Sequence, residues 1–256
     1  MFKYVTFNIR YDCERDGRNQ FVYRQPLILR AIQEEEPEII GFQEVMVHMA
    51  AWLKENLTDY YVIGCGRNRG LNGEQMSVAF RKDKYNLVEM RTFWLSETPY
   101  QSGSKYSDSA CPRTCTEAVF VELESRRPLR VLNTHLDYMG HLARMESIQQ
   151  IMRHVNGLSL FPDAPIILAG DFNADPETEE LKAMAQAKDF KNVTAGIGVT
   201  FHGFMQEANP SQIDYIFVRG GLNCQSVKKW DKYEENGVYI SDHYPVCAEL
   251  EWENQA

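Results

Sequence analysis

The sequence contains no long apolar run, and no apolar segment follows its first residue. No stretch of about 18 consecutive apolar residues occurs, which argues against a transmembrane helix. The opening residues, MFKYVTFNIR, alternate between apolar and polar side chains as a strand does, and they contain no small-residue cleavage site. We therefore expect no signal peptide, no membrane partner and a cytoplasmic location.

Cysteine is scarce and is not spaced for a metal site. Six cysteines occur among 256 residues, no Cys-x-x-Cys is present, and Cys111 and Cys115 have no second pair at zinc-site spacing. A chain of this length can bury a core without disulfide bonds. We expect the cysteines to be reduced and mostly buried.

Positive charge is also in short supply. Lys and Arg number 27 against 36 Asp and Glu, which gives a net charge of −9 with His neutral. Such a chain has no general attraction for a phosphate backbone, which disfavours a duplex DNA-binding protein. A phosphate group held by a metal ion or by a local basic pocket is compatible with this charge. No feature of the sequence indicates a protein partner.

The sequence does contain alternating strand and helix patterns. Apolar residues at helical spacing predict a helix through 142–155, and Pro26 and Asp175-Pro176 are expected at the first turns of two others. About ten strands and four helices are expected in mixed order, without a linker or an internal repeat. This order predicts one α/β domain over residues 1–256, in which helices cover a two-sheet core.

Polar side chains recur where the apolar strands end or begin. They include carboxylates, amides and histidines, which have little local reason to stand there; the positions are Asn8, Glu44, His135, Asp171, Asn173, Asp214, Asp242 and His243. In a sheet core such groups can converge at one rim, where a ligand binds. Oxygen ligands without thiolates favour Mg²⁺ or Mn²⁺ over zinc. A metal, a base and amide donors together suit hydrolysis of a phosphate ester by an activated water.

Six motifs extend this interpretation, because in this order they resemble the endonuclease/exonuclease/phosphatase superfamily. They cover nearly the whole chain and read TFNIR (6–10), GFQE (41–44), NTHLD (133–137), GDFNADP (170–176), IDYIF (213–217) and SDHYPV (241–246). The resemblance implies a deoxyribonuclease-I-like fold, which is a four-layer α/β/β/α sandwich of two mixed sheets. Residues 92–116 are similar to a bacterial subgroup that resembles the carbon-catabolite-repressor-type deadenylase catalytic domain.

The resemblance also implies a metal centre. Glu44 would be the principal ligand of one or two Mg²⁺ or Mn²⁺ ions, with Asn8 beside it and Asp242 close by. A first-turn helix acid is the structural alternative for Glu44, and that role is compatible with metal binding.

The remaining roles follow from the same resemblance. Asp171 would orient and deprotonate the attacking water, and Asn173 would hold the nucleophile or a phosphoryl oxygen. His243 would contact the phosphoryl group, polarised by Asp214, and His135 would donate to a second phosphoryl oxygen. Transition-state charge on the phosphoryl oxygens is what such donors stabilise.

Substrate-binding residues are predicted less directly. Arg10 stands where abasic-site nucleases of the superfamily carry Asp, so that position loses a metal ligand and instead offers a cation to a phosphate. Arg67 and Arg113 lie in polar loops and are candidates for the substrate phosphate, with solvated loop positions as the alternative. His202 is a candidate for the pocket, with loop packing as the alternative.

Three functions are consistent with these residues. The first is a metal-dependent phosphodiesterase or 3′–5′ exonuclease-like enzyme, whose substrate would include single-stranded nucleic acid. The second is a phosphatase or phosphodiesterase of a small phosphorylated metabolite, which would need only a short pocket. The third is a catalytically degenerate protein that binds a phosphate ligand. The complete set of motif residues favours the hydrolases.

Overall fold

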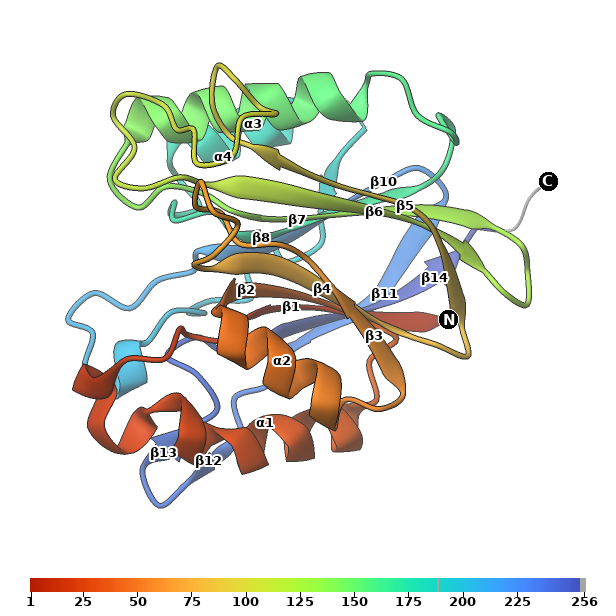
Figure 1. Ribbon diagram of the computed structural model, residues 1–256. Helices are drawn as coiled ribbons and strands as arrows, with labels where there is room; N and C mark the ends of the chain where they lie inside the picture. Colours follow the sequence, from red (N-terminus) through yellow and green to blue (C-terminus); the bar gives the residue numbers. More distant parts are fainter. Residues whose placement is uncertain (188, 254–256) are drawn as a thin grey trace.

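The computed structural model describes residues 1–187 and 189–253, which form four layers. Two six-stranded sheets stack face to face, and two helices cover the outer face of each (Figure 1). Helices α1 (Phe21–Glu35) and α2 (Val47–Asn56) cover the first sheet, whereas α3 (His141–Val155) and α4 (Glu179–Gln186) cover the second. The predicted four-layer sandwich of two mixed sheets is confirmed.

Each sheet contains one parallel pair of strands near its centre. In the first sheet β1 (Phe2–Asn8) runs parallel to β2 (Ile39–Val45), and in the second β7 (Pro128–His135) runs parallel to β8 (Ile166–Asp171). Because parallel neighbours end at the same edge of a sheet, the polar residues at these strand ends are brought together.

Antiparallel strands complete both sheets. The first has the order β11-β14-β1-β2-β4-β3, with β3 (Tyr60–Ile63), β4 (Gln75–Arg81), β11 (Leu222–Lys229) and β14 (Val246–Trp252). The second has the order β5-β6-β7-β8-β10-β9, with β5 (Tyr85–Trp94), β6 (Thr114–Glu122), β9 (Lys191–Asn192) and β10 (Asp214–Arg219). A small hairpin and two 3-10 turns lie outside the sheets: β12 (Glu234–Glu235), β13 (Val238–Tyr239), η1 (Glu14–Asn19) and η2 (Gly203–Met205).

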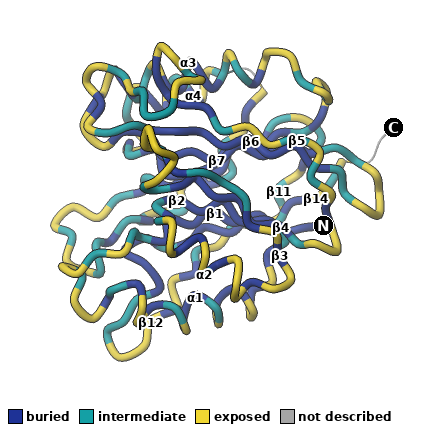
Figure 2. Tube along the Cα trace, viewed as in Figure 1, coloured by how far each residue is buried: buried dark blue, intermediate teal, exposed yellow. Residues whose placement is uncertain are grey.

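Apolar side chains fill the spaces between neighbouring layers. The strands that carry them are mostly buried, as the dark blue segments of Figure 2 show. Successive strand residues point to opposite faces, so Val131 packs between the sheets while Leu132 packs beneath α3 and α4. Phe80 and Phe120 join the two sheets, with ring centroids 4.7 Å apart. Burying each such aromatic side chain contributes about 2 kcal/mol, so the sheets form a firm base for the loops above them.

Two helix starts differ from the sequence predictions. Pro26 lies inside α1, which begins at Phe21, because the apolar face of the helix extends back to that residue. Asp175 does not cap α4, whose first turn follows Thr178; the Thr178 hydroxyl instead donates to the Asp175 carbonyl. Helix starts depend on such tertiary contacts as much as on local sequence.

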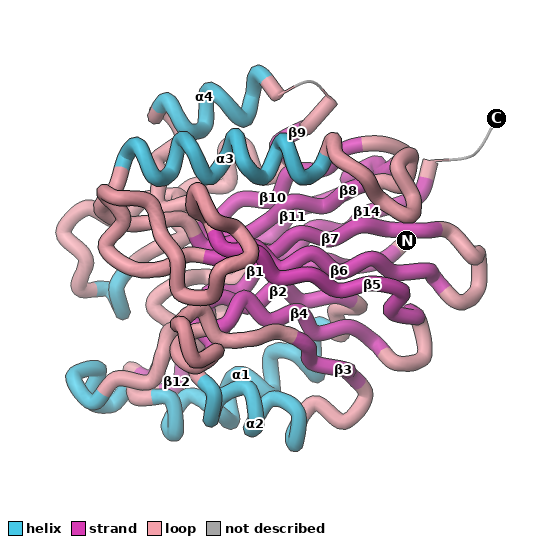
Figure 3. Tube along the Cα trace, turned by 45° about the horizontal axis from the view of Figure 1, so that its top comes forward, coloured by secondary structure: helices cyan, strands magenta, loops and turns pink. Residues whose placement is uncertain are grey.

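The long loops that follow the central strands gather at one end of the sandwich, away from the N-terminus (Figure 3). Within the described residues, no helix has the length and apolar character needed to cross a membrane. All six cysteines are free, but only Cys115 and Cys247 are buried, so the expectation that most are buried is wrong.

Gly170 allows β8 to approach β7 closely just before Asp171. Its φ is +145°, and a Cβ placed there would lie 1.9 Å from the carbonyl oxygen of Thr134. We expect Gly170→Ala to lower the free energy of unfolding by about 3 kcal/mol or more, because the obstacle is backbone and cannot turn aside. Urea unfolding monitored by circular dichroism measures the change.

The matched control is Gly196→Ala. Gly196 also has a positive φ, of +78°, but no atom of the described residues lies within 4 Å of an added Cβ. This substitution is expected to cost about 1 kcal/mol through backbone conformation alone. Equal losses in the two variants would show that the close approach of β7 and β8 is not the cause.

Candidate active site

A cavity of about 510 Å³ opens at the end of the sandwich where β1, β2, β7 and β8 terminate. Its ionisable lining residues come from both sheets and the loops between them: Arg10, Tyr11, Glu44, Arg67, Glu74, Cys111, Arg113, His135, Tyr138, Asp171, Asp242 and His243. A cavity of similar size, about 500 Å³, lies at the opposite strand ends near Arg127 and Trp252 and contains no such cluster. The composition of the first cavity, not its size, identifies it as the candidate active site.

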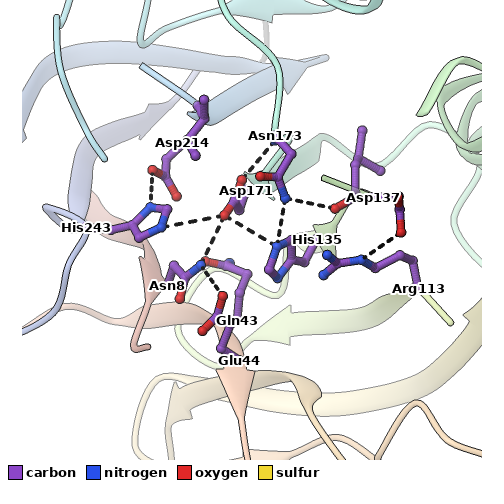
Figure 4. A network of polar contacts seen from close by, with 12 residues as sticks. Asn8, Gln43, Glu44, Arg113, His135, Asp137, Asp171, Asn173, Asp214 and His243 are labelled. Atoms are coloured by element: carbon purple, nitrogen blue, oxygen red, sulfur yellow. Dashed lines mark hydrogen bonds and ion pairs between the residues drawn. The ribbon is translucent and has the colours of Figure 1, made fainter. Parts of the chain in front are cut away.

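Asp171, the last residue of β8, is at the centre of a buried network (Figure 4). One carboxylate oxygen accepts the Asn173 backbone N–H at 2.9 Å, and the other accepts the Asn8 side-chain N–H at 3.0 Å. Burial and the charge of Asp214 raise the pKa of Asp171 to about 7, against the opposing effect of His243. Asp171 is therefore set to exchange a proton near neutral pH.

His243 lies between two carboxylates. Its Nδ1 is 2.8 Å from Asp214, the first residue of β10, and its Nε2 is 3.8 Å from Asp171. Burial alone would lower the pKa of His243, but Asp214 and the neighbouring carboxylates outweigh it and raise the pKa to about 10. The ring is thus a buried imidazolium that points one N–H toward the site.

His135 ends β7 and is neutral by contrast. Burial, followed by the charges of Arg113 and Arg67, holds the pKa of His135 well below its usual value. Its Nε2 accepts the side-chain N–H of Asn173 at 2.9 Å, and the same NH₂ group donates to the carbonyl of Leu136 at 3.0 Å. In this arrangement Nε2 accepts a hydrogen bond and does not donate one.

Backbone geometry directs Glu44 into the cavity. The register of β2 against β4 shifts between Phe42 and Val45, and within this bulge Glu44 has a φ of +64°. Its carboxylate accepts the Tyr11 backbone N–H at 2.9 Å and the Asn8 side-chain N–H at 3.2 Å. Asn8 thus joins Glu44 to Asp171, and a non-glycine residue with positive φ at this point is typical of a functional site.

Asp242 completes the acidic side of the cavity. Its carboxylate lies 3.5 Å from Arg10, which forms a bidentate ion pair with Asp16 at 2.9 Å. Burial raises the pKa of Asp242, and the nearby charge of Glu44 raises it further. The carboxylates of the cavity therefore repel one another.

These donors fit a hard divalent cation. Carboxylate and amide oxygens are the ligands that Mg²⁺ and Mn²⁺ prefer, and a cation beside Glu44 and Asp242 would offset their repulsion. A second group that could hold a metal consists of Asp171, Asp214 and His243, whose ligand atoms lie within 4.8 Å of one another. In this second group both ring nitrogens of His243 face carboxylates. Asp171, Asp214 and His243 are therefore already held together by ion pairs.

Two further motif residues connect the sheets beneath the cavity. The side-chain N–H of Gln43 donates to the oxygen of Asn133 at 2.7 Å, and Asn133 donates to the carbonyls of Phe42 and Ser77. A buried, hydrogen-bonded amide pair of this kind fixes the position of one sheet on the other. The amide pair thereby fixes the distance between Glu44 on the first sheet and the site residues on the second.

The predicted substrate-binding residues separate into two groups. Arg10, Arg67 and Arg113 line the cavity, where their contact with a substrate phosphate stays a prediction. His202 is not among its lining residues: it is buried and packs against Tyr244, with ring centroids 4.2 Å apart. Its Nδ1 accepts the Met205 backbone N–H, so the structure gives His202 the packing role and not the substrate contact.

Sequence reasoning did not single out Glu74 or Arg24. Glu74 lines the cavity and pairs with Arg67 at 2.6 Å. Arg24 is fully buried in α1 and donates to the carbonyls of Ile9, Arg10 and Ile240, beside the segments that carry Asn8 and Asp242. Glu74 stands in a polar loop and Arg24 in a helix with other polar residues, so no sequence pattern marked either of them.

Residues 5–243 match the model of the endonuclease/exonuclease/phosphatase family. The chain belongs to this family. The family consists of phosphoester hydrolases, so this endonuclease/exonuclease/phosphatase protein is assigned to that enzyme class.

Three similar proteins cover nearly the whole chain. A Bacteroides vulgatus endonuclease/exonuclease/phosphatase is 32% identical with a TM-score of 0.92 and covers 98% of this chain and 99% of its own. A Bacteroides thetaiotaomicron mannosyl-6-phosphatase is 28% identical with a TM-score of 0.88 and covers 98% and 100%. An uncharacterised mimivirus protein, L388 of Acanthamoeba polyphaga mimivirus, is 26% identical over 89% of this chain and 91% of its own.

Proposed function

We propose that this protein is a divalent-metal-dependent hydrolase of phosphate esters in which Asp171 activates the attacking water. The observation that carries the proposal is the setting of Asp171, a buried carboxylate that lines the cavity and is held by Asn8 and Asn173. A pKa of about 7 suits a group that takes a proton from water near neutral pH.

Glu44 and Asp242, with Asn8 beside them, would hold one or two Mg²⁺ or Mn²⁺ ions. When bound, the metal supplies positive charge to the phosphoryl oxygens. Arg10, held by its ion pair with Asp16, also places a positive charge 3.5 Å from Asp242 and offsets part of the charge of that carboxylate.

The reaction consumes one water molecule. Asp171 takes a proton from the water, whose oxygen forms a bond to phosphorus while the ester P–O bond breaks. The leaving oxygen departs with the bonding electron pair and takes up a proton, so the products are an alcohol and a phosphate. Holding the water between Asp171 and phosphorus supplies the orientation that raises the rate.

His243 would contact the phosphoryl group, whereas Asn173, whose NH₂ group already donates to His135 and Leu136, would hold the attacking water through its amide oxygen. The imidazolium of His243, stabilised by Asp214, directs its Nε2–H toward Asp171 and the cavity. Such a charged donor stabilises the negative charge that builds up on phosphoryl oxygens. The predicted donation from His135 Nε2 requires Asn173 to release that atom, so in this arrangement His135 orients Asn173.

Two classes of substrate are compatible with the proposed hydrolase. A phosphodiesterase or 3′–5′ exonuclease-like activity is the general expectation from the chain's motifs. A small phosphorylated metabolite is favoured by a specific observation: Arg10 and Arg67 are already paired with Asp16 and Glu74, so they leave little free positive charge for a long polyanion. The cavity volume of about 510 Å³ is in the range of small-molecule sites, and the mannosyl-6-phosphatase is a similar protein.

Removal of divalent metal tests the proposal. After EDTA treatment and dialysis, we expect hydrolysis of p-nitrophenyl phosphate and bis(p-nitrophenyl) phosphate to fall at least about tenfold and to recover with Mg²⁺ or Mn²⁺. Glu44→Gln should raise the metal concentration that gives half-maximal rate by about tenfold or more, because one charged ligand is lost. Initial rates across a metal titration measure both effects.

The matched control is Glu235→Gln, since Glu235 is exposed and pairs with Arg30 on the surface. This variant should titrate with metal as the unmodified protein does. Full activity in chelated protein would overturn the metal role. Tight phosphate binding without hydrolysis of any ester would instead support a non-catalytic phosphate-binding protein.

A further inference from the structure

Arg113 presents a buried cation with unused hydrogen-bond donors. It stands directly before β6, its side chain is 5% exposed, and its Nε and Nη1 have no partner within the described part of the chain. A buried charged donor without an acceptor costs several kcal/mol, so proteins rarely keep one without a ligand. Arg113 stands at the wall of the candidate active site, where a bound ligand can supply the missing acceptors.

Asp137 does not satisfy this guanidinium. The nearest approach between Arg113 Nε and Asp137 is 3.7 Å, which is beyond hydrogen-bond distance. The Asp137 carboxylate instead accepts backbone N–H groups of Ala110, Met139 and Gly140 at 3.0, 2.9 and 2.8 Å. Asp137 thus builds the loop around Arg113 and leaves the guanidinium donors free.

The other arginines of the cavity are engaged. Arg10 forms its bidentate pair with Asp16, and Arg67 donates to Glu74 at 2.6 Å, with only its Nη1 unpartnered. Among the cavity-lining arginines that the structure describes, Arg113 therefore has the largest unused donor capacity.

The guanidinium of Arg113 lies close to the reacting groups. It lines the same cavity as Asp171 and Asn173, and Figure 4 places it beside His135, on the side away from His243. The charge of Arg113 is one of the causes that hold the pKa of His135 below its usual value. The exposed ring of Tyr138, 6.0 Å from the guanidinium carbon, partly covers it.

We infer that Arg113 binds the third non-bridging oxygen of a terminal phosphoryl group and so makes the enzyme prefer phosphomonoesters to phosphodiesters. The inference rests on the proposed function and specifies its substrate class. His243 faces the phosphoryl group from one side of the cavity, and the fork of Arg113 meets its third oxygen from the other. In a diester that oxygen carries a second ester group and no charge, so it cannot accept the fork.

Arg113→Met tests this preference. We expect kcat/KM for p-nitrophenyl phosphate, divided by that for bis(p-nitrophenyl) phosphate, to fall about thirtyfold or more. Arg113→Lys keeps the charge but not the fork and should give an intermediate ratio. Arg130→Met is the matched control: Arg130 is equally buried but pairs with Glu117 away from the cavity, so it should lower stability and leave the ratio unchanged.

Inorganic phosphate provides a second readout that does not require catalysis. In EDTA, phosphate should raise the melting temperature of the unmodified protein, and Arg113→Met should weaken its dissociation constant about tenfold or more. This measurement also keeps the inference testable if Arg113→Met is less stable, because each variant is compared with itself without phosphate.

The possible results distinguish a failure of this inference from a failure of the proposed function. An unchanged monoester-to-diester ratio and unchanged phosphate affinity in Arg113→Met would overturn the inference while leaving the hydrolase proposal intact. A loss confined to substrates that carry a second phosphate group, such as a nucleoside 3′,5′-bisphosphate, would also overturn it, because Arg113 would then bind that distant group. Absence of hydrolysis with phosphate binding that still depends on Arg113 would refute the hydrolase and support the anion site.

Discussion

Asp171→Asn is expected to lower kcat for phosphate ester hydrolysis by about a thousandfold or more. The amide has nearly the same shape as the carboxylate but cannot take a proton from water, and general-base catalysis contributes about 10²- to 10⁴-fold. Loss of orientation adds to this effect, since the Asn8 and Asn173 N–H groups would face an NH₂ group for one of their contacts. Steady-state rates at saturating substrate and metal measure the change.

Asp175→Asn provides the comparison for this variant. Asp175 belongs to the same GDFNADP segment but is exposed and lies outside the cavity lining. Its kcat should stay within about twofold of the unmodified value, as for most surface substitutions. An Asp171→Asn enzyme with a comparable rate would exclude Asp171 as the base, whatever its position in the network.

His243→Gln is expected to lower kcat by about a hundred- to a thousandfold. The imidazolium is a charged donor in a buried setting, and removing one such donor to a transition-state oxygen costs about that factor. KM should change much less than kcat, because charge on the phosphoryl oxygens is greatest in the transition state. Initial rates over a range of substrate concentrations separate the two constants.

A double-mutant cycle with Asp214 tests how His243 acts. Asp214 contacts the ring at 2.8 Å and does not line the cavity, so its contribution should pass through His243. We expect Asp214→Asn alone to lower kcat by about tenfold or more, and to have little further effect in a His243→Gln background. Fully additive losses would mean that Asp214 acts on the reaction independently of the ring.

The meeting of the candidate site residues at one edge could be predicted from chain geometry, whereas their roles were implied by the family resemblance. Asn8, His135 and Asp171 each end a strand, and Asp214 begins one, so the strand pattern and the topology together bring them to one edge. The hydrophobic pattern that specifies the sandwich also specifies this edge. Their assignments as catalytic and metal-binding residues stay predictions until the variants above are measured.

The cavity wall could not be predicted in the same way. Glu74, which the sequence did not single out, belongs to a loop whose course is set by contacts between distant segments, such as the bond from the Trp94 indole N–H to the Arg67 carbonyl. Arg113 could be named only as a candidate, with a solvated loop position as the alternative. No periodicity distinguishes a loop arginine that faces a cavity from one that faces water. His202 was a candidate for the pocket and is instead buried against Tyr244. That burial depends on tertiary packing, which a loop sequence does not reveal.

The place of β14 in the first sheet determines when the protein can become functional during its synthesis. β14 forms five residue pairs with β1 and separates it from β11, although nearly the whole chain lies between β1 and β14. During synthesis, one hydrogen-bonding edge of β1 therefore stays unpaired until β14 has left the ribosome. An unpaired edge of this kind is prone to pair with a wrong strand. Asp242 and His243 lie a few residues before that strand, so a partly made chain lacks both the sheet and the site.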